Sequence, residues 1–271
     1  MNSHLHIHAA TRNGITYLKQ SYYTPPFKVA NITEDKKAGP LHLMLMCSSP
    51  GVLEGDDYQV KINIEEDSYL HLHTQSYQRL FNMKNGASQC MEVYLQKGSS
   101  FIYIPHPAVP HKQSVFTTRN KIYLQGNNRL IWGELLTCGR KLNGEQFDFV
   151  KYHSITDVYL HGRLVIKENW MIQPTITNVH TIGQWEGYSH QASLIILDKP
   201  DTITPAYERI NNYLHQQKEL TFGISTLPNA GIIVRLLGHK AEQLFNCQKT
   251  IAALVTANNN HLAKIPVAHV N

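Results

Sequence analysis

The chain has 271 residues, of which 42% are hydrophobic and 17% are charged, and its formal net charge is +5. A chain of this length can bury a substantial core, either as one large β domain or as one domain with a smaller appendage. Its basic residues are scattered and form no run of five or six like charges, so no nucleic-acid partner is expected.

The four cysteines, Cys47, Cys90, Cys138 and Cys247, lie far apart and form no CxxC pair. This spacing argues against a zinc knuckle and against a small disulfide framework. The opening residues MNSHLHIHAATRNG lack the basic and apolar regions of a signal peptide, and no long apolar run follows. We therefore expect a cytoplasmic protein in a reducing compartment, with no membrane partner.

Residues 1–174 have the sequence pattern of a β-rich body. Tyr58, Val60, Ile62 and Ile64 alternate with polar residues, which is typical of a half-buried strand. The segments EEDS, KGSS and GNN join such strands and are interpreted as hairpin turns. Because they recur at intervals of about thirty residues, they suggest two-strand units stacked on one another. The expected body is a β-helical-like or sandwich-like stack of hairpins.

The sequence pattern changes in residues 175–256, which are expected to form an α+β portion packed on the same body. A buried strand, SLIILDKP, precedes a predicted helix over residues 205–219, with Thr204 as N-cap and Pro205 at the first helical position. FGISTLPNAGIIVRLLG predicts two strands around a turn, and an apolar stripe predicts a second helix over residues 239–255. Residues 257–271 are expected to be a loose tail.

Sixteen histidines raise the question of a metal site. His4, His6 and His8 alternate, as do His71 and His73, so each set lies on one face of its strand. Imidazoles at this spacing can bind nickel, copper or zinc. Exposed histidines on the polar side of an amphipathic strand are the plainer interpretation, and both remain open.

The strongest enzyme alternative is a metal-dependent, cupin-like site. His71 and His73 would supply its HxH pair and His111 its later histidine. The carboxylate expected four or five residues after the pair is missing, because Tyr77 and Gln78 stand there. A plain β-sandwich binding module is a third possibility.

The order of five segments is more specific than any one of them. SPGVLEGD, LHTQSYQRLF, YIPHPAVPHKQSVF, LIWGELLTCGRKLNGEQFDF and FGISTLPNAGIIVRLLG occur in this order. Over residues 23–254 the chain resembles the urease accessory protein UreD family, called UreH in some bacteria. The resemblance implies a maturation factor that is not an enzyme and has no tightly bound cofactor. It would be a scaffold that binds apo-urease and a UreF-type protein, with a UreG-type protein docked on the latter, and that passes Ni²⁺ transiently.

Two acidic residues are implicated by this resemblance alone. Asp56 follows Gly55 in a turn that is bulkier than is usual in the family, and Glu168 lies shortly before residue 174, where the sequence pattern changes. The resemblance implies that both carboxylates contact nickel transiently. From the residues alone, Asp56 is interpreted as an Asx-type turn residue.

Other residues are expected to have structural or partner-binding roles. Arg209 and Lys240 lie on the two predicted helices, which as late additions to a sheet body are expected to present the surface for the UreF-type partner. The remaining motif residues are expected to shape hairpins or packed elements, with Arg140 paired to a nearby acid. They are Glu134, Gly139, Arg140, Gly144 and Glu145 in one segment, and Gly231, Arg235 and Gly238 in another.

Overall fold

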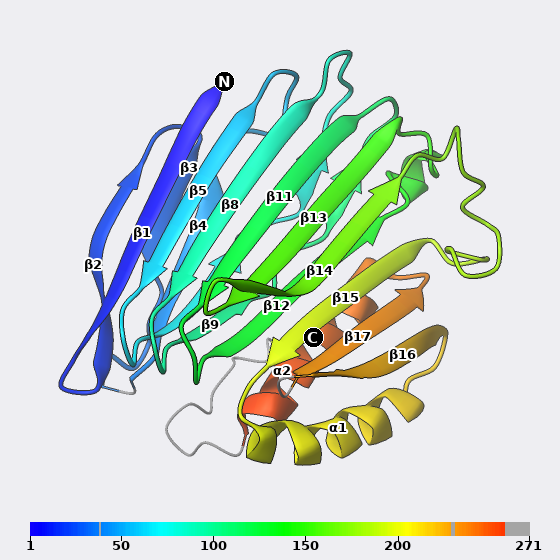
Figure 1. The fold of residues 1–271 in the computed structure, drawn as a ribbon. Helices are drawn as coiled ribbons and strands as arrows, with labels where there is room; N and C mark the ends of the chain where they lie inside the picture. The colour runs from blue at the N-terminus through cyan, green and yellow to red at the C-terminus, as the bar shows by residue number, and fades with distance from the viewer. Residues whose placement is uncertain (38, 229–230, 258–271) are drawn as a thin grey trace.

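The structure is a computed structural model that describes residues 1–37, 39–228 and 231–257 (Figure 1). In this part of the chain, two β-sheets face each other, and two helices in the C-terminal third pack beside the second sheet. The expectation of a mainly β fold with two late helices is confirmed.

The first sheet has the strand order β14-β13-β11-β8-β5-β1-β2. Five of its strands run parallel, and β2 and β14 are antiparallel strands at its two edges. Its strands are β1 (Asn2–Arg12), β2 (Ile15–Tyr23), β5 (Asp57–Ile64), β8 (Ala87–Leu95), β11 (Val115–Leu124), β13 (Lys151–Leu160) and β14 (Arg163–Ile172).

The second sheet has the strand order β16-β17-β15-β12-β9-β6-β4-β3, with the short strands β7 and β10 attached beside β12. Its central strands β4, β6, β9 and β12 are parallel. Its strands are β3 (Phe27–Asn31), β4 (Leu41–Cys47), β6 (Tyr69–Thr74), β7 (Gln78–Leu80), β9 (Ser100–Tyr103), β10 (Ala108–Pro110), β12 (Arg129–Thr137), β15 (His190–Leu197), β16 (Leu220–Leu227) and β17 (Gly231–Gly238).

The chain coils between the two sheets, which corrects the hairpin interpretation of three turns. EEDS joins β5 to β6, KGSS joins β8 to β9 and GNN joins β11 to β12, and each turn crosses from the first sheet to the second. Successive turns are tied together, because Asn128 donates hydrogen bonds to the backbone oxygens of Gln96 and Ser99. The thirty-residue rhythm is therefore one coil of the stack. The segment HGR, residues 161–163, joins the antiparallel strands β13 and β14 and forms a hairpin turn.

The main hydrophobic core lies between the two sheets. Tyr58, Val60, Ile62 and Ile64 of β5 are at most 4% exposed, which confirms the predicted buried face of that strand. Leu70 and Leu72 of β6 belong to the same core and approach it from the second sheet. Period-two alternation fills this core because successive side chains of a strand point to opposite faces.

A second core lies between the second sheet and the helices α1 (Pro200–His215) and α2 (Ala241–Thr256). The predicted bounds of α1, residues 205–219, were wrong at both ends: Pro200 occupies the first turn, Pro205 lies inside the helix, and the helix ends at His215. Both prolines suit a helix start, and the sequence pattern selected the later one. α2 agrees with its predicted range to within two residues.

The predicted C-terminal portion, residues 175–256, extends the β-rich body, because β15, β17 and β16 continue the second sheet beyond β12. The boundary at residue 174 stays a prediction. Of the predicted tail, residues 258–271 lie outside the described residues, as do Asn229 and Ala230 of the turn between β16 and β17.

Candidate functional site

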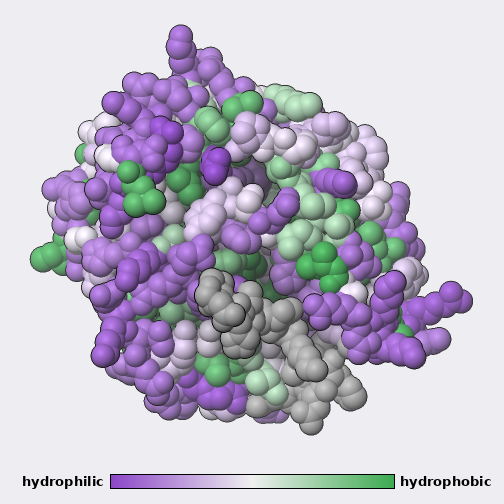
Figure 2. All heavy atoms as spheres, turned by 180° about the vertical axis from the view of Figure 1, so that it is seen from behind, coloured by the Kyte–Doolittle hydropathy of each residue, from purple (hydrophilic) through white to green (hydrophobic). Residues whose placement is uncertain are grey.

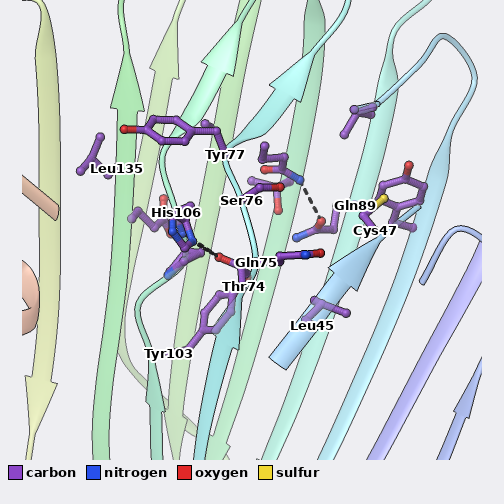
Figure 3. Close-up of a pocket in the computed structure, with 18 of the residues that line it drawn as sticks. Leu45, Cys47, Thr74, Gln75, Ser76, Tyr77, Gln89, Tyr103, His106 and Leu135 are labelled. Carbon is purple, nitrogen blue, oxygen red and sulfur yellow. Dashed lines mark hydrogen bonds between the residues drawn. The ribbon is translucent and has the colours of Figure 1, made fainter. Parts of the chain in front are cut away.

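A pocket of about 150 Å³ lies between the two sheets (Figure 3). The first sheet contributes Tyr58 and Gln89 to its lining, and the second contributes Cys47 and Trp132. The segment 74–78, which leads from β6 to β7, forms another part of the wall. A cavity of this size and polarity has room for several water molecules.

One carboxylate, that of Glu134, lies in the pocket lining among polar groups of both sheets. Glu134 is on β12, and its Oε2 accepts a hydrogen bond of 2.7 Å from the Ser154 hydroxyl of β13. Its Oε1 accepts hydrogen bonds from Thr156 Oγ1 at 2.7 Å and from the indole nitrogen of Trp132 at 3.1 Å. Asn120 of β11 donates to the same Thr156 hydroxyl at 2.9 Å. The network therefore joins β11 and β13 of the first sheet to β12 of the second.

The tyrosines around this network keep their protons at neutral pH. Burial, and then the charge of Glu134, raises the pKa of Tyr103 and of Tyr152. Burial likewise raises the pKa of the Cys47 thiol at the other side of the pocket. The lining thus offers neutral hydroxyls, amides and a thiol around one carboxylate, a set that can solvate a cation without holding it strongly.

The outer wall of the pocket is fixed by the segment 74–78 and its neighbours. Thr74 Oγ1 lies 2.9 Å from His106 Nδ1 and accepts a hydrogen bond of 2.8 Å from the backbone nitrogen of His106 (Figure 3). The His106 ring packs on Phe245 of α2, with ring centroids 4.6 Å apart. Tyr77 donates a hydrogen bond to Glu242 of α2. The helix α2 therefore supports this wall from outside.

Comparisons with known proteins show which family the chain belongs to. A model of the family described as UreD urease accessory protein matches residues 1–268. The chain belongs to the UreD family. A urease accessory protein UreD of Flavobacterium johnsoniae is 44% identical over 93% of this chain and 91% of its own length. The corresponding proteins of Acetivibrio thermocellus and Actinobacillus pleuropneumoniae are 34% and 32% identical, each over 92% of this chain and 95% of their own length.

Membership of the UreD family confirms the resemblance inferred from the five ordered segments. The relatives are named as accessory proteins, and the chain, like them, is not itself an enzyme. The cupin-like alternative is not favoured. Among the described residues, neither helix has the length and hydrophobicity that a bilayer crossing requires.

Asp56, the first residue that the UreD resemblance implies, lies in the turn before β5 and is 8% exposed. Its Oδ2 accepts hydrogen bonds from the Leu53 backbone nitrogen at 2.9 Å and the Tyr58 hydroxyl at 3.0 Å. Its Oδ1 lies 3.2 Å from the amino group of Met1. These contacts give Asp56 a clear role in the turn, and Tyr58 connects it to the pocket lining. Its contact with nickel stays a prediction.

Glu168, the second implied residue, lies on β14, and its carboxylate pairs with Arg235 of β17. The structure does not bring it to Asp56. Asp56 precedes β5, and β8, β11 and β13 separate that strand from β14. Four strand intervals of about 4.8 Å place the two residues about 19 Å apart across the sheet.

The histidines are arranged differently from the cupin-like alternative. His111 packs on Phe81, with ring centroids 4.7 Å apart, and does not join the pair on β6. His8 of the N-terminal set contacts Glu65 at 2.9 Å. His71 and His73 instead gather with His42, a residue that the sequence interpretation did not consider.

The residues expected to bind partners differ in exposure. Lys240 is exposed, as expected, and pairs with Glu219 at 3.0 Å. Arg209 of α1 is half-buried, against expectation, so a change there would also disturb packing. The back of the molecule, seen in Figure 2, carries hydrophobic side chains scattered among hydrophilic ones.

The expected structural residues fall into two groups. Arg140 donates to Glu145 at 2.8 Å, and Gly139 and Gly144 have positive φ angles of 128° and 82°, so this part of the interpretation is confirmed. Glu134 is different, because it lies within β12 and lines the pocket. An acid inside the apolar run RLIWGELL was the available signal, since even a half-buried carboxylate needs hydrogen-bond partners.

Proposed function

We propose that the chain is a scaffold in urease maturation that binds apo-urease and a UreF-type accessory protein, with a UreG-type protein docked on the latter. In this proposal it carries no tightly bound cofactor and passes Ni²⁺ toward the urease active site. The family membership and the names of the relatives support a role in urease maturation. The pocket between the sheets supports a role in ion passage.

The single observation that carries the nickel route is the carboxylate of Glu134 between two sheets. Desolvating an ionised carboxylate is costly, and a sheet-on-sheet core is normally filled by apolar side chains. Here hydroxyl and indole donors hold the carboxylate beside a pocket that has room for water. Carboxylate and hydroxyl oxygens bind a borderline cation such as Ni²⁺ weakly enough to release it.

The test of the route is the substitution Glu134→Gln, which keeps the side-chain size and removes the charge. We expect soluble protein and partner binding to persist, and the nickel content of urease to fall at matched levels of assembled complex. The matched control is Glu92→Gln, because Glu92 accepts a hydrogen bond from Tyr94 outside the pocket lining. Full nickel loading by the Glu134 variant would refute the route through this carboxylate.

We also infer that the protein works in the cytoplasm. Its four cysteines, all in the described part of the chain, are free thiols. Free thiols persist in a reducing compartment, whereas secreted proteins usually oxidise them to disulfides. Fractionation of cells that express the tagged full-length chain tests this inference directly.

A further inference from the structure

Three imidazoles gather on the face of the second sheet that points away from the first. His42 on β4 and His71 and His73 on β6 offer ring nitrogens that all lie within 4.8 Å of one another. His42 Nδ1 is 3.2 Å from His73 Nε2, and the His42 and His71 ring centroids are 4.5 Å apart. The neighbouring Leu41, Leu43, Leu70 and Leu72 point into the core between the sheets, which places the imidazoles on the opposite face.

The pairing of two strands explains why these histidines meet. β4 and β6 are parallel neighbours, and their register aligns His42 with His71. Residues two apart on one strand are separated by about 6.8 Å, whereas neighbouring strands lie about 4.8 Å apart. His4, His6 and His8 share one strand only, and the rings of His4 and His6 are 6.5 Å apart. The second strand therefore converts an ordinary alternating pair into a compact cluster.

The surroundings of the cluster favour neutral imidazoles. Burial lowers the pKa of all three rings, that of His73 to about 4. His71 is 4% exposed, and its ring makes no hydrogen bond within the described residues. His42 and His73 are half-buried, which leaves a way in from solvent. The charge of Glu34 opposes the effect of burial and raises the pKa of His42, whereas the charge of Lys249 lowers the pKa of His73 further.

We propose that His42, His71 and His73 form a three-imidazole binding site for a divalent transition-metal ion of the nickel and zinc class. A metal with metal–nitrogen bonds of about 2.1 Å in tetrahedral geometry holds its ligand nitrogens about 3.4 Å apart. The present separations, from 3.2 Å up to 4.8 Å, require only small side-chain rotations to reach that geometry. Imidazole ligands suit nickel, zinc and copper, and three of them leave a position for water or an exchanging ligand.

This site is independent of the nickel route between the sheets. The cluster lies on the outer face of the second sheet, whereas Glu134 faces the first sheet, and none of the three histidines lines the pocket. The proposal can therefore fail while the route stands, and the route can fail while the site binds metal. Glu134→Gln, which leaves all three imidazoles in place, distinguishes the two.

The test measures metal binding to the purified full-length chain. NiCl₂ and ZnCl₂ are titrated separately against a competing chelator, so that weakly binding surface histidines do not contribute. For one of the two ions we expect binding at one ion per chain. We expect His42→Ala and His73→Ala each to lower its affinity about tenfold or more, since even loss of an outer partner of a metal ligand costs about 10- to 100-fold. With Co²⁺ bound as a spectroscopic probe, both variants should show weaker visible absorption than the nitrogen-ligated site of the wild type.

The matched control is the triple variant His4→Ala, His6→Ala, His8→Ala, which removes the same number of imidazoles from one strand. It should retain the wild-type affinity, as should Glu134→Gln. Circular dichroism of each variant confirms that the sheet is intact, and His71→Asn gives a third change in the cluster if one of the others misfolds. Unchanged affinity in the folded cluster variants, or loss of affinity in the N-terminal triple variant alone, would overturn the proposal.

Discussion

Arg235 of β17 donates two hydrogen bonds to the carboxylate of Glu168 on β14, at 2.8 Å to Oε1 and 2.7 Å to Oε2. β14 is the edge of the first sheet and β17 belongs to the second, so this pair ties the two sheets together at the end where the first one stops. The acid that the UreD resemblance assigns to nickel thus already has a cationic partner. Two variants distinguish a role of Glu168 in the ion pair from a role in nickel transfer.

We expect Glu168→Gln to lower the nickel content of urease at matched levels of complex, and Arg235→Gln, which keeps the carboxylate, to leave it unchanged. Both should reduce the free energy of unfolding by at most about 1 kcal/mol, because partly exposed ion pairs contribute little. A double-mutant cycle in urea measures that coupling. Equal nickel loading by the two variants would restrict Glu168 to the ion pair.

Asp56→Ala is expected to destabilise the turn before β5. The substitution leaves the Leu53 backbone nitrogen and the Tyr58 hydroxyl without their acceptor, and the carboxylate they contact is 8% exposed. Leaving buried donors unpaired costs about 1–3 kcal/mol each, so the thermal midpoint should fall by several degrees. Asp56→Asn, which keeps one acceptor oxygen, should recover part of the loss.

Nickel loading then decides whether Asp56 does more than hold the turn. If the defect in urease nickel content follows only the amount of soluble protein, Asp56 acts through stability. If Asp56→Asn loads less nickel at matched complex levels, the carboxylate takes part in transfer. Wild-type stability of Asp56→Ala would contradict the turn contacts described above.

The sequence predicted the strands well because period-two alternation reports one buried face directly. It could not predict which strands pair, and EEDS was interpreted as a hairpin although it links β5 and β6 in different sheets. A turn that reverses the chain and a turn that crosses between layers use the same residue types. The prediction of where α1 starts failed for a similar reason, since Pro200 and Pro205 both suit the first turn of a helix.

The sites were harder to predict because they depend on distant pairings. His71 and His73 were visible as a pair, but His42 joins them only through the register of β4 and β6. Glu134 needed its partners Ser154 and Thr156 from the other sheet before its place in a pocket could be recognised. No local pattern in the sequence carries such long-range contacts.

His190 is expected to make stability depend on pH. It is buried at the start of β15, its Nδ1 lies 2.8 Å from Ser189 Oγ, and burial, with the charges of Lys141 and His239, lowers its pKa to about 4. The unfolded value is about 6.5, so between the two values the unfolded chain binds a proton that the folded chain does not. The stabilisation is complete above about pH 6.5 and decreases by up to about 3 kcal/mol as the pH falls through 4.

Urea unfolding of the wild type and of His190→Gln across pH 7 to 4 measures this contribution. The variant should lose less stability over that range, because glutamine does not titrate. His153→Gln, at a histidine whose Nε2 lies 2.8 Å from Asn169 Oδ1 on the exposed side of the first sheet, serves as the control. Parallel pH profiles for all three proteins would contradict the assignment to His190.

The surface near Lys240 is expected to contact the UreF-type partner. Lys240 precedes α2, is exposed and pairs with Glu219. Lys240→Glu places two acids together and should weaken co-purification with the partner without changing the melting temperature by more than about 2 °C. Lys61→Glu, on the exposed side of β5 in the first sheet, tests whether a charge change elsewhere has the same effect. Equal yields for both variants would indicate a different partner surface.

Gln248 is expected to hold α2 on the second sheet. Its side chain is fully buried, and its Nε2 donates hydrogen bonds to the backbone oxygens of Glu134 at 3.0 Å and Ser193 at 2.9 Å. Glu134 and Ser193 face each other on β12 and β15, so one amide ties the helix to two strands behind the pocket.

Gln248→Leu removes both hydrogen bonds while it keeps a side chain of similar length, and it leaves two backbone oxygens in an apolar contact. We expect a loss of about 1–3 kcal/mol in the free energy of unfolding. Asn246→Leu, at an exposed position of the same helix, should change it by no more than about 0.5 kcal/mol. Hydrogen exchange should locate the effect in α2, because the main core between the sheets does not include this residue. If the α2 amides of Gln248→Leu exchange as slowly as those of the wild type, the helix is held by its apolar contacts with Leu194 and Val234 instead.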